Sequence, residues 1–264
     1  MLTQISDKRQ LLSFLKTDPF LHVYSIGDLD DFFWERTTWY AWVEQNAIRA
    51  LFLLYQGDDS VPTLLALEEQ NSEVAIALLH DLRHSLPERF YGHFSVHLLP
   101  HHGKWYNAES SRLHLKMKLE KDRFSPALEP QNQRVIHLRQ GDLQRVLTLY
   151  REAYPGNWFD PRMLETGQYL GIEDAGRLVA VAGIHVFSPQ YKVVALGNIT
   201  THPAFRGKGL STLLTSSLCR QLFETVDWIG LNVAYGNHAA IRCYSKIGFV
   251  EHCRFEEILV TGRI

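Results

Sequence analysis

Two glycines that follow a Val- and Ile-rich stretch give the clearest chemical signal in the chain. Residues 199–211 read ITTHPAFRGKGLS, and a helical pattern of leucines begins at their end. Gly207 and Gly209 permit positive φ and a close approach of the backbone, so several N–H groups can point at one spot. The positive end of the following helix adds to this, and Arg206 and Lys208 supply charge. The turn therefore predicts a phosphate or pyrophosphate site, although Gly-x-Gly alone is weak and matches neither a Walker A loop nor GxGxxG.

A second motif lies about thirty residues further along. Residues 237–249 read NHAAIRCYSKIGF, which has the form N-x-x-A-x-x-x-Y-x-x-x-G-F. Together with the upstream R-G-x-G, this pattern resembles the GNAT superfamily of acyl-CoA N-acyltransferases. The resemblance covers nearly all of residues 133–264, and two motifs at this separation are more specific than either alone. It implies acetyl-CoA, or another short acyl-CoA, as co-substrate and no metal.

The resemblance also assigns roles to single positions. It implies that the strand ending at Thr201 splays from the strand over residues 228–235, with the pantetheine arm in the gap and the pyrophosphate over the glycine turn. Asn237 is expected beside the cofactor arm, and Tyr244 is expected to point toward the thioester sulfur. The cofactor-binding residues implied in this way are Ile199, Thr200, Thr201, Arg206, Gly207, Lys208, Gly209, Leu210, Ser211 and Asn237.

The sequence departs from the family pattern at two positions. The turn of the family usually ends in Gly or Ala, whereas Ser211 stands here; serine is small, and its hydroxyl can bond a phosphate. Many relatives carry an acidic residue on the strand before the turn, six positions before the residue that matches Thr201. That position is Ala195, so the general base of such relatives cannot be carried over.

Direct attack of an amine on a thioester needs a neutral amine, a donor for the oxyanion and a proton for the leaving thiolate. A backbone N–H near Thr201 can serve as the donor. Tyr244 fits the acid role, because a tyrosine side chain with a reference pKa of about 10 is protonated at pH 7 and can protonate a thiolate. The alternative is that Tyr244 only packs on the apolar face of its helix. The two motifs together favour the acid.

The general base stays open at this stage. His185 and His202 have a suitable side chain for the task, although each can equally be an ordinary half-buried or exposed histidine. Asn198 is polar within an apolar strand and is a candidate to face the substrate, but it cannot act as a base. Acidic candidates that could act through a water are Glu173, Asp174, Glu256 and Glu257.

Other conspicuous residues have simpler explanations. His80 and His84 stand at i and i+4 on a predicted helix, close to the H-E-x-x-H zinc signature, but Asp81 replaces the Glu and no third ligand stands at a family spacing. His101–His102 is interpreted as a loop. An aromatic cluster could line a substrate pocket or a domain interface, and a core is the commoner explanation; it comprises Phe32, Phe33, Trp34, Trp39, Tyr40 and Trp42.

Hydrophobic periodicity predicts an α+β fold for residues 133–264. The expected strands are 135–138, 169–173, 178–187, 192–201, 228–235 and 249–260. The expected helices are 142–150, a short one after Asp160-Pro161, 208–225 and 237–247, the last ended by Gly248. The element order is β α α β β β α β α β.

The first half has nearly the same order. The expected helices are 8–15, 21–33 and 72–85, and the expected strands are 38–44, 47–55, 62–67, 94–98 and 111–119. The order α α β β β α β β matches the second half except for the short helix before the last strand. We therefore predict two mixed, mostly antiparallel sheets flanked by helices, in tandem, with a duplication and an unrelated α+β domain as open alternatives for residues 1–120. The stretch 121–132, rich in charge and proline, is predicted to be a linker.

Composition bounds the function class. The chain has 264 residues, 45% apolar, with 27 basic against 29 acidic residues, so it has no general footprint for nucleic acid. Charge is uneven: residues 1–132 hold 13 basic and 18 acidic residues (13 − 18 = −5), and residues 133–264 hold 14 and 11 (14 − 11 = +3). The three cysteines fit no zinc or disulfide pattern and favour a reducing cytoplasm. The charged N-terminal residues do not read as a signal peptide or membrane span.

These observations favour a two-domain cytoplasmic enzyme that transfers an acetyl group from CoA to a primary amine. The acceptor is expected to be a small molecule or a peptide, with the first domain shaping its pocket or serving a structural role; neither nucleic acid nor membrane is expected as a partner, and a homodimer is left open. The rival hypothesis is a non-catalytic acyl-CoA-binding or sensing protein, which the missing acidic residue at Ala195 favours and Tyr244 opposes.

Overall fold

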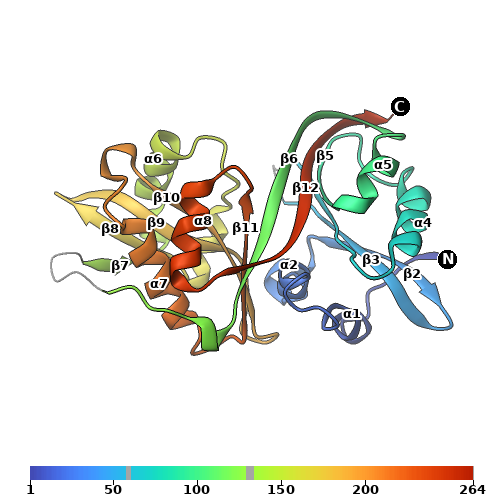
Figure 1. Cartoon of the computed structure of the whole chain (residues 1–264), viewed down its shortest axis with the longest axis horizontal. Helices are drawn as coiled ribbons and strands as arrows, with labels where there is room; N and C mark the ends of the chain where they lie inside the picture. The colour runs from blue at the N-terminus through green and yellow to red at the C-terminus, as the bar shows by residue number, and fades with distance from the viewer. Residues whose placement is uncertain (58–60, 129–133, 264) are drawn as a thin grey trace. The chain divides into compact units, whose positions relative to one another are not determined.

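The computed structural model describes residues 1–57, 61–128 and 134–263. Two compact units emerge from the contacts between residues. The first unit comprises Met1–Lys116, Ala234–Gly236 and His252–Ile264, and the second comprises Met117–Val233 and Asn237–Glu251. Figure 1 labels their elements, and each unit is described by itself.

The sheet of the second unit mixes antiparallel and parallel pairs. Its strand order is β11-β10-β9-β8-β7. Neighbours from β7 to β10 are antiparallel, whereas β10 and β11 are parallel. The strands are β7 (Val135–His137), β8 (Leu170–Asp174), β9 (Arg177–Ser188), β10 (Val193–Thr201) and β11 (Trp228–Ala234).

Helices cover this sheet (Figure 1). α6 (Leu143–Ala153) packs on β9 and β10, and α7 (Leu210–Leu222) packs on β8, β9, β10 and α8 (His238–Ile247). Their apolar faces meet strands such as β9, which is buried without interruption from Leu178 to Ile184. Short 3₁₀ turns complete the unit: η2 (Lys121–Arg123), η3 (Gln140–Asp142), η4 (Pro161–Thr166) and η5 (Pro203–Phe205).

The first unit follows the same plan. Its strands pair in the order β1-β2-β3-β4-β5-β12, with β4 and β5 parallel and the others antiparallel. They are β1 (Leu2–Gln4), β2 (Thr37–Glu44), β3 (Ala47–Tyr55), β4 (Thr63–Ala66), β5 (Phe90–Ser95) and β12 (Val250–Arg263). The helical elements are α1 (Lys8–Leu15), α2 (Val23–Gly27), α3 (Asp31–Trp34), α4 (Ser72–Leu82), η1 (Val96–Leu98) and α5 (Leu99–His102). β6 (Tyr106–Leu119) begins in this unit.

The shared plan confirms the predicted tandem architecture. In each unit three antiparallel strands lead into a helix, and the next strand returns parallel to the third. The last strand, however, returns to the first unit: β12 pairs with β5, from Phe255 opposite Ser95 to Val260 opposite Phe90. The predicted boundaries, 1–120 and 133–264, place this strand with the second half, because local periodicity does not identify the partner of a strand.

The predicted linker lies on the second unit over its described part. The amide of Ser125 donates to the carbonyl of Ile247 at 2.8 Å, and the amide of Ala127 donates to Ser216 Oγ at 2.8 Å. The ring of Phe124 packs on Phe223, with the ring centroids 5.5 Å apart. These contacts tie residues 121–127 to α7 and α8; residues 129–132 of the prediction lie outside the described part.

Two predictions in the first unit are wrong. The helix expected over residues 21–33 is two short helices, because Asp30 accepts from the amide of Phe32 and caps a new start. The strand expected over residues 94–98 is β5 at Phe90–Ser95, followed by helical turns that Pro100 favours. Gly92 made this strand hard to predict, because glycine weakens the pattern of a strand. The structure requires a glycine there, since a Cβ would overlap the Phe94 ring.

The predicted aromatic cluster lies largely in the core of the first unit. Phe33, Trp39 and Tyr40 are buried, and Trp42 packs against the same core as Tyr40. Trp34 stacks on Trp39 with the ring centroids 6.1 Å apart. Among the described residues, no helix is both long enough and apolar enough to cross a bilayer.

A buried lysine stands out in the first unit. Lys116 is 1% exposed, and its ammonium lies 4.7 Å from the centroid of the Tyr24 ring and 5.9 Å from that of Phe255. Burial lowers the pKa of Lys116 to about 8, against the smaller opposing effects of Cys253 and Asp18. The charged form is therefore a cost to folding at neutral pH.

Lys116→Met is expected to raise the free energy of unfolding at pH 7 by up to about 3 kcal/mol, because each tenfold change in the ionisation equilibrium of the buried amine corresponds to about 1.4 kcal/mol. The pKa of the folded state lies below the ordinary 10.5, so the cost is complete below pH 8 and vanishes above 10.5. Urea denaturation at pH 7 and pH 10 should show a gain that shrinks with rising pH. Lys118→Met, on the same strand and ion-paired with Glu120, is the control; a less stable Lys116→Met variant at pH 7 would contradict the expectation.

Candidate active site

The parallel strands β10 and β11 are hydrogen-bonded to each other over only about half of their length. Their residues pair from Val193 opposite Trp228 to Leu196 opposite Leu231, and no pair is formed beyond these within the described structure. On its other edge β10 stays paired with β9, through register shifts at 195/196 and between Gly197 and Thr200. The last part of β10 therefore keeps β9 as its partner and is no longer paired with β11, which is the divergence that the resemblance implied.

A β-bulge marks the place where the strands diverge. Asn198 has φ +56° and is buried, and it lies with Ile199 between the paired residues Gly197 and Thr200. Its carbonyl accepts from the Tyr150 hydroxyl at 2.9 Å, and its Nδ2 donates to the Tyr169 hydroxyl at 3.1 Å. Asn198 was predicted as a candidate to face the substrate; the structure instead places its side chain in a buried network under the bulge.

The glycine turn after β10 has the geometry of an anion site. Gly207 and Gly209 have φ of +79° and +77°, which a side chain would strain. Gly209 is the N-cap of α7, and the backbone amides of residues 207–211 donate to no described residue. Residues 207–209 are exposed, while Leu210 is buried and Ser211 half-buried, so the unpaired amides of the turn lie at the positive end of α7 next to solvent.

The side chains of the turn also make contacts within the protein. The guanidinium of Arg206 donates to the carbonyls of Thr201 at 3.2 Å and Ala153 at 3.3 Å, and its amide donates to Pro203. Ser211 Oγ lies 2.7 Å from Thr201 Oγ1, which ties the turn to the end of β10. Arg206 and Ser211 thus hold the turn in shape, while Lys208 lies over the Phe205 ring.

Asn232 is a polar residue of β11 just past its pairing with β10. It follows Leu231, the last residue of β11 that pairs with β10. Its buried side-chain oxygen Oδ1 has no hydrogen-bond donor within the described residues. A buried acceptor without a donor costs about 1–3 kcal/mol, so this atom fits a site whose donor comes from a ligand, such as an amide of a pantetheine arm.

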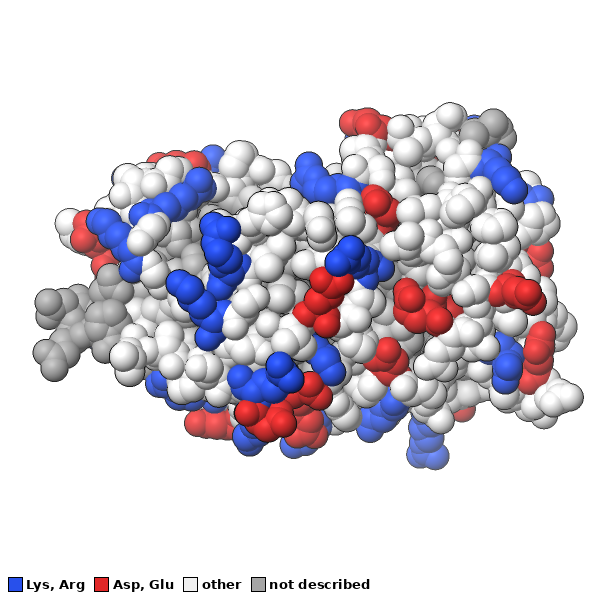
Figure 2. Space-filling model, in the orientation of Figure 1, with Lys and Arg blue, Asp and Glu red and all other residues white. Residues whose placement is uncertain are grey.

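The second motif forms α8, directly after β11. Asn237 caps this helix, with Oδ1 accepting from the amide of Ala240 at 3.2 Å, which leaves its Nδ2 as the side-chain donor. Tyr244 is 8% exposed and lies 5.8 Å from the Phe249 ring, between centroids. Gly248 ends the helix with φ +111°, as predicted. Figure 2 shows Lys and Arg side chains over α8, which contains Arg242 and Lys246 and no acidic residue.

Of the two histidine candidates for the base, His185 lies at the bulge. Its ring packs on Gly197 so closely that a Cβ on that glycine would overlap it, and it lies 5.7 Å from the Trp158 ring between centroids. His202 instead caps the turn: Nδ1 accepts from the amide of Ala204 at 3.3 Å, and Nε2 lies 3.0 Å from the Arg177 guanidinium.

Three of the four acidic candidates have side-chain partners elsewhere. Glu173 pairs with Arg145, whereas Asp174 ends β8 at the exposed hairpin. Glu256 accepts from Ser111 at 2.7 Å, and Glu257 pairs with His93 at 3.2 Å, both within the first unit. Burial would raise the pKa of Glu257, but the hydrogen bond and charge of His93 outweigh it and lower that pKa to about 2.

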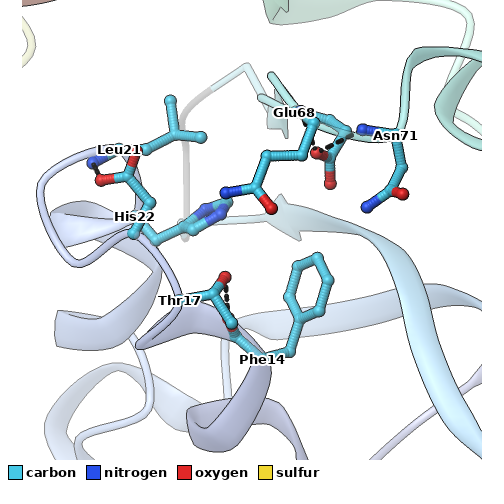
Figure 3. Close-up of a pocket in the computed structure, with 8 residues that line it drawn as sticks. Phe14, Thr17, Leu21, His22, Glu68 and Asn71 are labelled. Atoms are coloured by element: carbon cyan, nitrogen blue, oxygen red, sulfur yellow. Dashed lines mark hydrogen bonds between the residues drawn. The ribbon is translucent and has the colours of Figure 1, made fainter.

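The first unit carries no glycine turn at the matching place. After β4, the carboxylate of Glu68 accepts from the amides of Gln70 at 2.7 Å and Asn71 at 3.0 Å (Figure 3). The adjoining pocket, lined also by Phe14 and His22, holds about 10 Å³, room for one water. The amides that would meet a phosphate are thus engaged by the protein's own carboxylate.

The histidine pair resembling a zinc motif is not set on one helix face. α4 ends at Leu82, so His84 lies beyond it, and His80 pairs with Asp81 at 3.1 Å. Over the part of the chain that the structure describes, no group of three His, Cys, Asp or Glu residues could hold a metal ion. His101 belongs to α5, where a loop was predicted.

Comparison with known proteins identifies the second half. Residues 133–249 match the model of the Acetyltransferase (GNAT) family. They form a GNAT domain. The chain is also 34% identical over 107 residues to the mycothiol acetyltransferase of Tsukamurella paurometabola, a match that covers 39% of this chain and 37% of the relative. The match therefore spans little more than a third of the length of that relative.

Solved structures match this chain across both units. A Drosophila protein matches with a TM-score of 0.76 at 15% identity, covering 98% of each chain. A tandem GNAT protein from the clavulanic acid biosynthesis pathway matches with a TM-score of 0.62 at 15% identity, covering 99% of each chain. At these identities the likeness shows the fold alone, which is two GNAT-like units in tandem.

Three features of the GNAT domain were not foreseen from the sequence: the network under the bulge, the carbonyl contacts of Arg206 and the unsatisfied Asn232. Asn198 and Asn232 are each polar within an apolar strand. This pattern could have indicated the network under the bulge and the unsatisfied oxygen of Asn232. The contacts of Arg206 with Ala153 and Thr201 have no signature, since the partners are backbone carbonyls.

Gly209→Glu is expected to weaken CoA binding by at least about 100-fold, because it adds bulk and negative charge where the amides face a pyrophosphate. Gly176→Glu is a matched control: Gly176 has φ +80°, lies in the β8–β9 hairpin and, like Gly209, would meet no atom with a Cβ within 4 Å. The two variants should lose similar stability, and calorimetry should show a loss of CoA affinity only for Gly209→Glu. Equal affinities in the two variants would exclude the turn as the site.

Proposed function

We propose that the protein is an N-acetyltransferase that moves an acetyl group from acetyl-CoA to a primary amine. The observation that carries the proposal is the parting of β10 and β11 beside a turn with five open amides. The opening offers backbone groups to a pantetheine arm, and the turn offers N–H groups to a pyrophosphate. The family uses acyl-CoA, and these residues fit that co-substrate. The name of the mycothiol acetyltransferase relative favours a small-molecule acceptor.

The reaction requires one bond to form and one to break. The amine nitrogen forms a bond to the acyl carbon, the carbon–sulfur bond breaks, the nitrogen loses a proton and the CoA sulfur receives one. Backbone N–H groups of β10 near Thr201 would stabilise the oxyanion, and Tyr244 would donate the proton to sulfur. Asn237 and Asn232 would flank the cofactor arm from α8 and β11.

His185 is the base that the geometry favours. Its ring packs on Gly197, next to the bulge, whereas His202 caps the turn and lies 3.0 Å from the Arg177 guanidinium. Trp158 borders it from the loop between α6 and η4. An acceptor amine held between this loop and the bulge would have an imidazole within reach of its proton.

The experiment that tests the function is turnover of acetyl-CoA with a broad panel of amines, read as free thiol released. Release of CoA that depends on an amine is the expected result. Tight binding of acetyl-CoA by calorimetry without turnover for any amine would favour the rival, an acyl-CoA-binding or sensing protein that has lost the acidic residue at the position of Ala195. No binding at all would refute both.

Tyr244→Phe is expected to lower kcat by roughly 10- to 100-fold, because only the proton donor is removed. The affinity for CoA should change little. Tyr191→Phe, a tyrosine in the β9–β10 turn, serves as the matched control for loss of a hydroxyl. A wild-type kcat for Tyr244→Phe, measured where chemistry limits the rate, would leave the tyrosine with a packing role.

Titration with CoA is expected to give one site per chain, since the first unit has Glu68 in place of an open turn. Glu68 would repel a pyrophosphate, and the adjoining pocket has room for one water only. Gly209→Glu should abolish the single transition in calorimetry. A second CoA per chain, or binding that survives in that variant, would contradict the assignment.

A further inference from the structure

We infer that Asn198, Tyr150 and Tyr169 form a positioning clamp that fixes the β10 bulge so that its backbone amides meet the acyl carbonyl. The inference rests on the proposed function and extends it to residues that touch neither substrate. The clamp acts through the backbone of β10, and none of its members needs to titrate.

The clamp is a chain of connected hydrogen bonds, of which all but one are buried. The Tyr150 hydroxyl, from α6, donates to the carbonyl of Asn198 at 2.9 Å, and Asn198 Nδ2 donates to the Tyr169 hydroxyl at 3.1 Å. The Tyr169 hydroxyl in turn donates to the carbonyl of Ile184 on β9 at 2.8 Å. Asn157 Nδ2 donates to Asn198 Oδ1 at 3.3 Å. Both the backbone and the side chain of Asn198 are thereby held.

Burial makes these bonds rigid. Tyr169 is fully buried, Tyr150 is 3% exposed and Asn198 is 4% exposed. Burial raises the pKa of both tyrosines well above the ordinary value, so each stays a proton donor across the working pH range. Away from water, a lost partner leaves an unsatisfied group, so the network keeps one arrangement.

The surrounding glycines allow the clamp to reach the strand. A Cβ on Gly183 would overlap the Tyr169 ring, so this ring lies directly on the backbone of β9 opposite Gly197. Asn198 has φ +56°, a conformation that Asn tolerates better than other residues with a side chain. Asn is thus the residue that combines the bulge conformation with a donor and an acceptor.

The position of the bulge determines whether its backbone amides can stabilise the oxyanion. An oxyanion donor acts only when it lies at hydrogen-bond distance from the developing charge, and removing one such donor costs about 10²- to 10³-fold in rate. A displacement of about 1 Å can cost about 100-fold. A clamp that fixes residues 198–200 therefore changes kcat without a large change in the affinity for the cofactor, whose pyrophosphate is held at the separate turn.

The test uses Asn198→Gly and Tyr169→Phe in the full chain. Glycine keeps the positive φ and removes the side-chain bonds, and phenylalanine keeps the ring and removes the hydroxyl. Each is expected to lower kcat about 10- to 100-fold, with acetyl-CoA affinity within about threefold of wild type and an unchanged pH profile. Since both variants remove the bond between Asn198 and Tyr169, the double variant should be about as slow as the slower single one. Tyr154→Phe, a half-exposed tyrosine at the end of α6, is the control.

A second readout needs no amine. The carbonyl stretch of ¹³C-labelled acetyl-CoA should shift to lower frequency on binding to the wild type, and the shift should be lost in Asn198→Gly. The clamp would be overturned if both single variants kept the wild-type kcat, or if their losses of kcat added up in the double variant. It would also be overturned if kcat fell only together with the melting temperature and the affinity for the cofactor. If the wild type binds but turns over no amine, a shift lost in Asn198→Gly supports the clamp while the proposed catalysis fails. An unshifted carbonyl in the wild type overturns the clamp.

Discussion

The site depends on one constraint, that β10 cannot stay paired with both neighbours past Leu196. The bulge at Asn198 turns the strand, so the pairing with β9 continues and the pairing with β11 ends. Backbone N–H and C=O groups require partners, and an opening inside a sheet is stable only when a ligand or water supplies them. The turn after β10 follows the end of this strand that no longer pairs with β11, and Asn232 and the cap of α8 follow the last paired residue of β11. The roles proposed for these groups depend on the end of this pairing.

The parts of the site that are local in sequence were predictable. The glycine turn, the start of α7 and the Gly248 cap are each encoded within a few residues, because positive φ and capping are properties of single positions. The network under the bulge was not predictable, since it joins Tyr150, Asn157, Tyr169 and Asn198 from four separate segments. Asn198 stands out in the sequence as a polar residue in an apolar strand, but sequence alone does not show which way such a side chain points.

The fold shows the same limit. Strands β3 and β9 were located to within one or two residues, because their alternating or continuous apolar patterns are strong. The partner of the last strand was not predictable, as pairing between β12 and β5 joins residues that lie about 165 positions apart. The duplicated order of elements in the two halves was the better guide, because it reflects a shared strand plan and not single pairings.

The two units share one order of strands and helices but differ in whether the backbone amides after the third strand have partners. In the first unit β3 and β4 pair without a register shift, and Glu68 satisfies the amides of the turn after β4. In the second unit the matching strand is bulged, the matching amides are open and Asn232 Oδ1 lacks a donor among the described residues. The first unit satisfies the amides of its turn internally, whereas the second unit leaves the matching amides and Asn232 Oδ1 without partners in the described part of the chain. Unsatisfied polar groups cost free energy, and they are tolerated where a ligand can offset that cost. The contrast between the units therefore supports the cofactor site proposed in the second unit, on grounds other than its motifs.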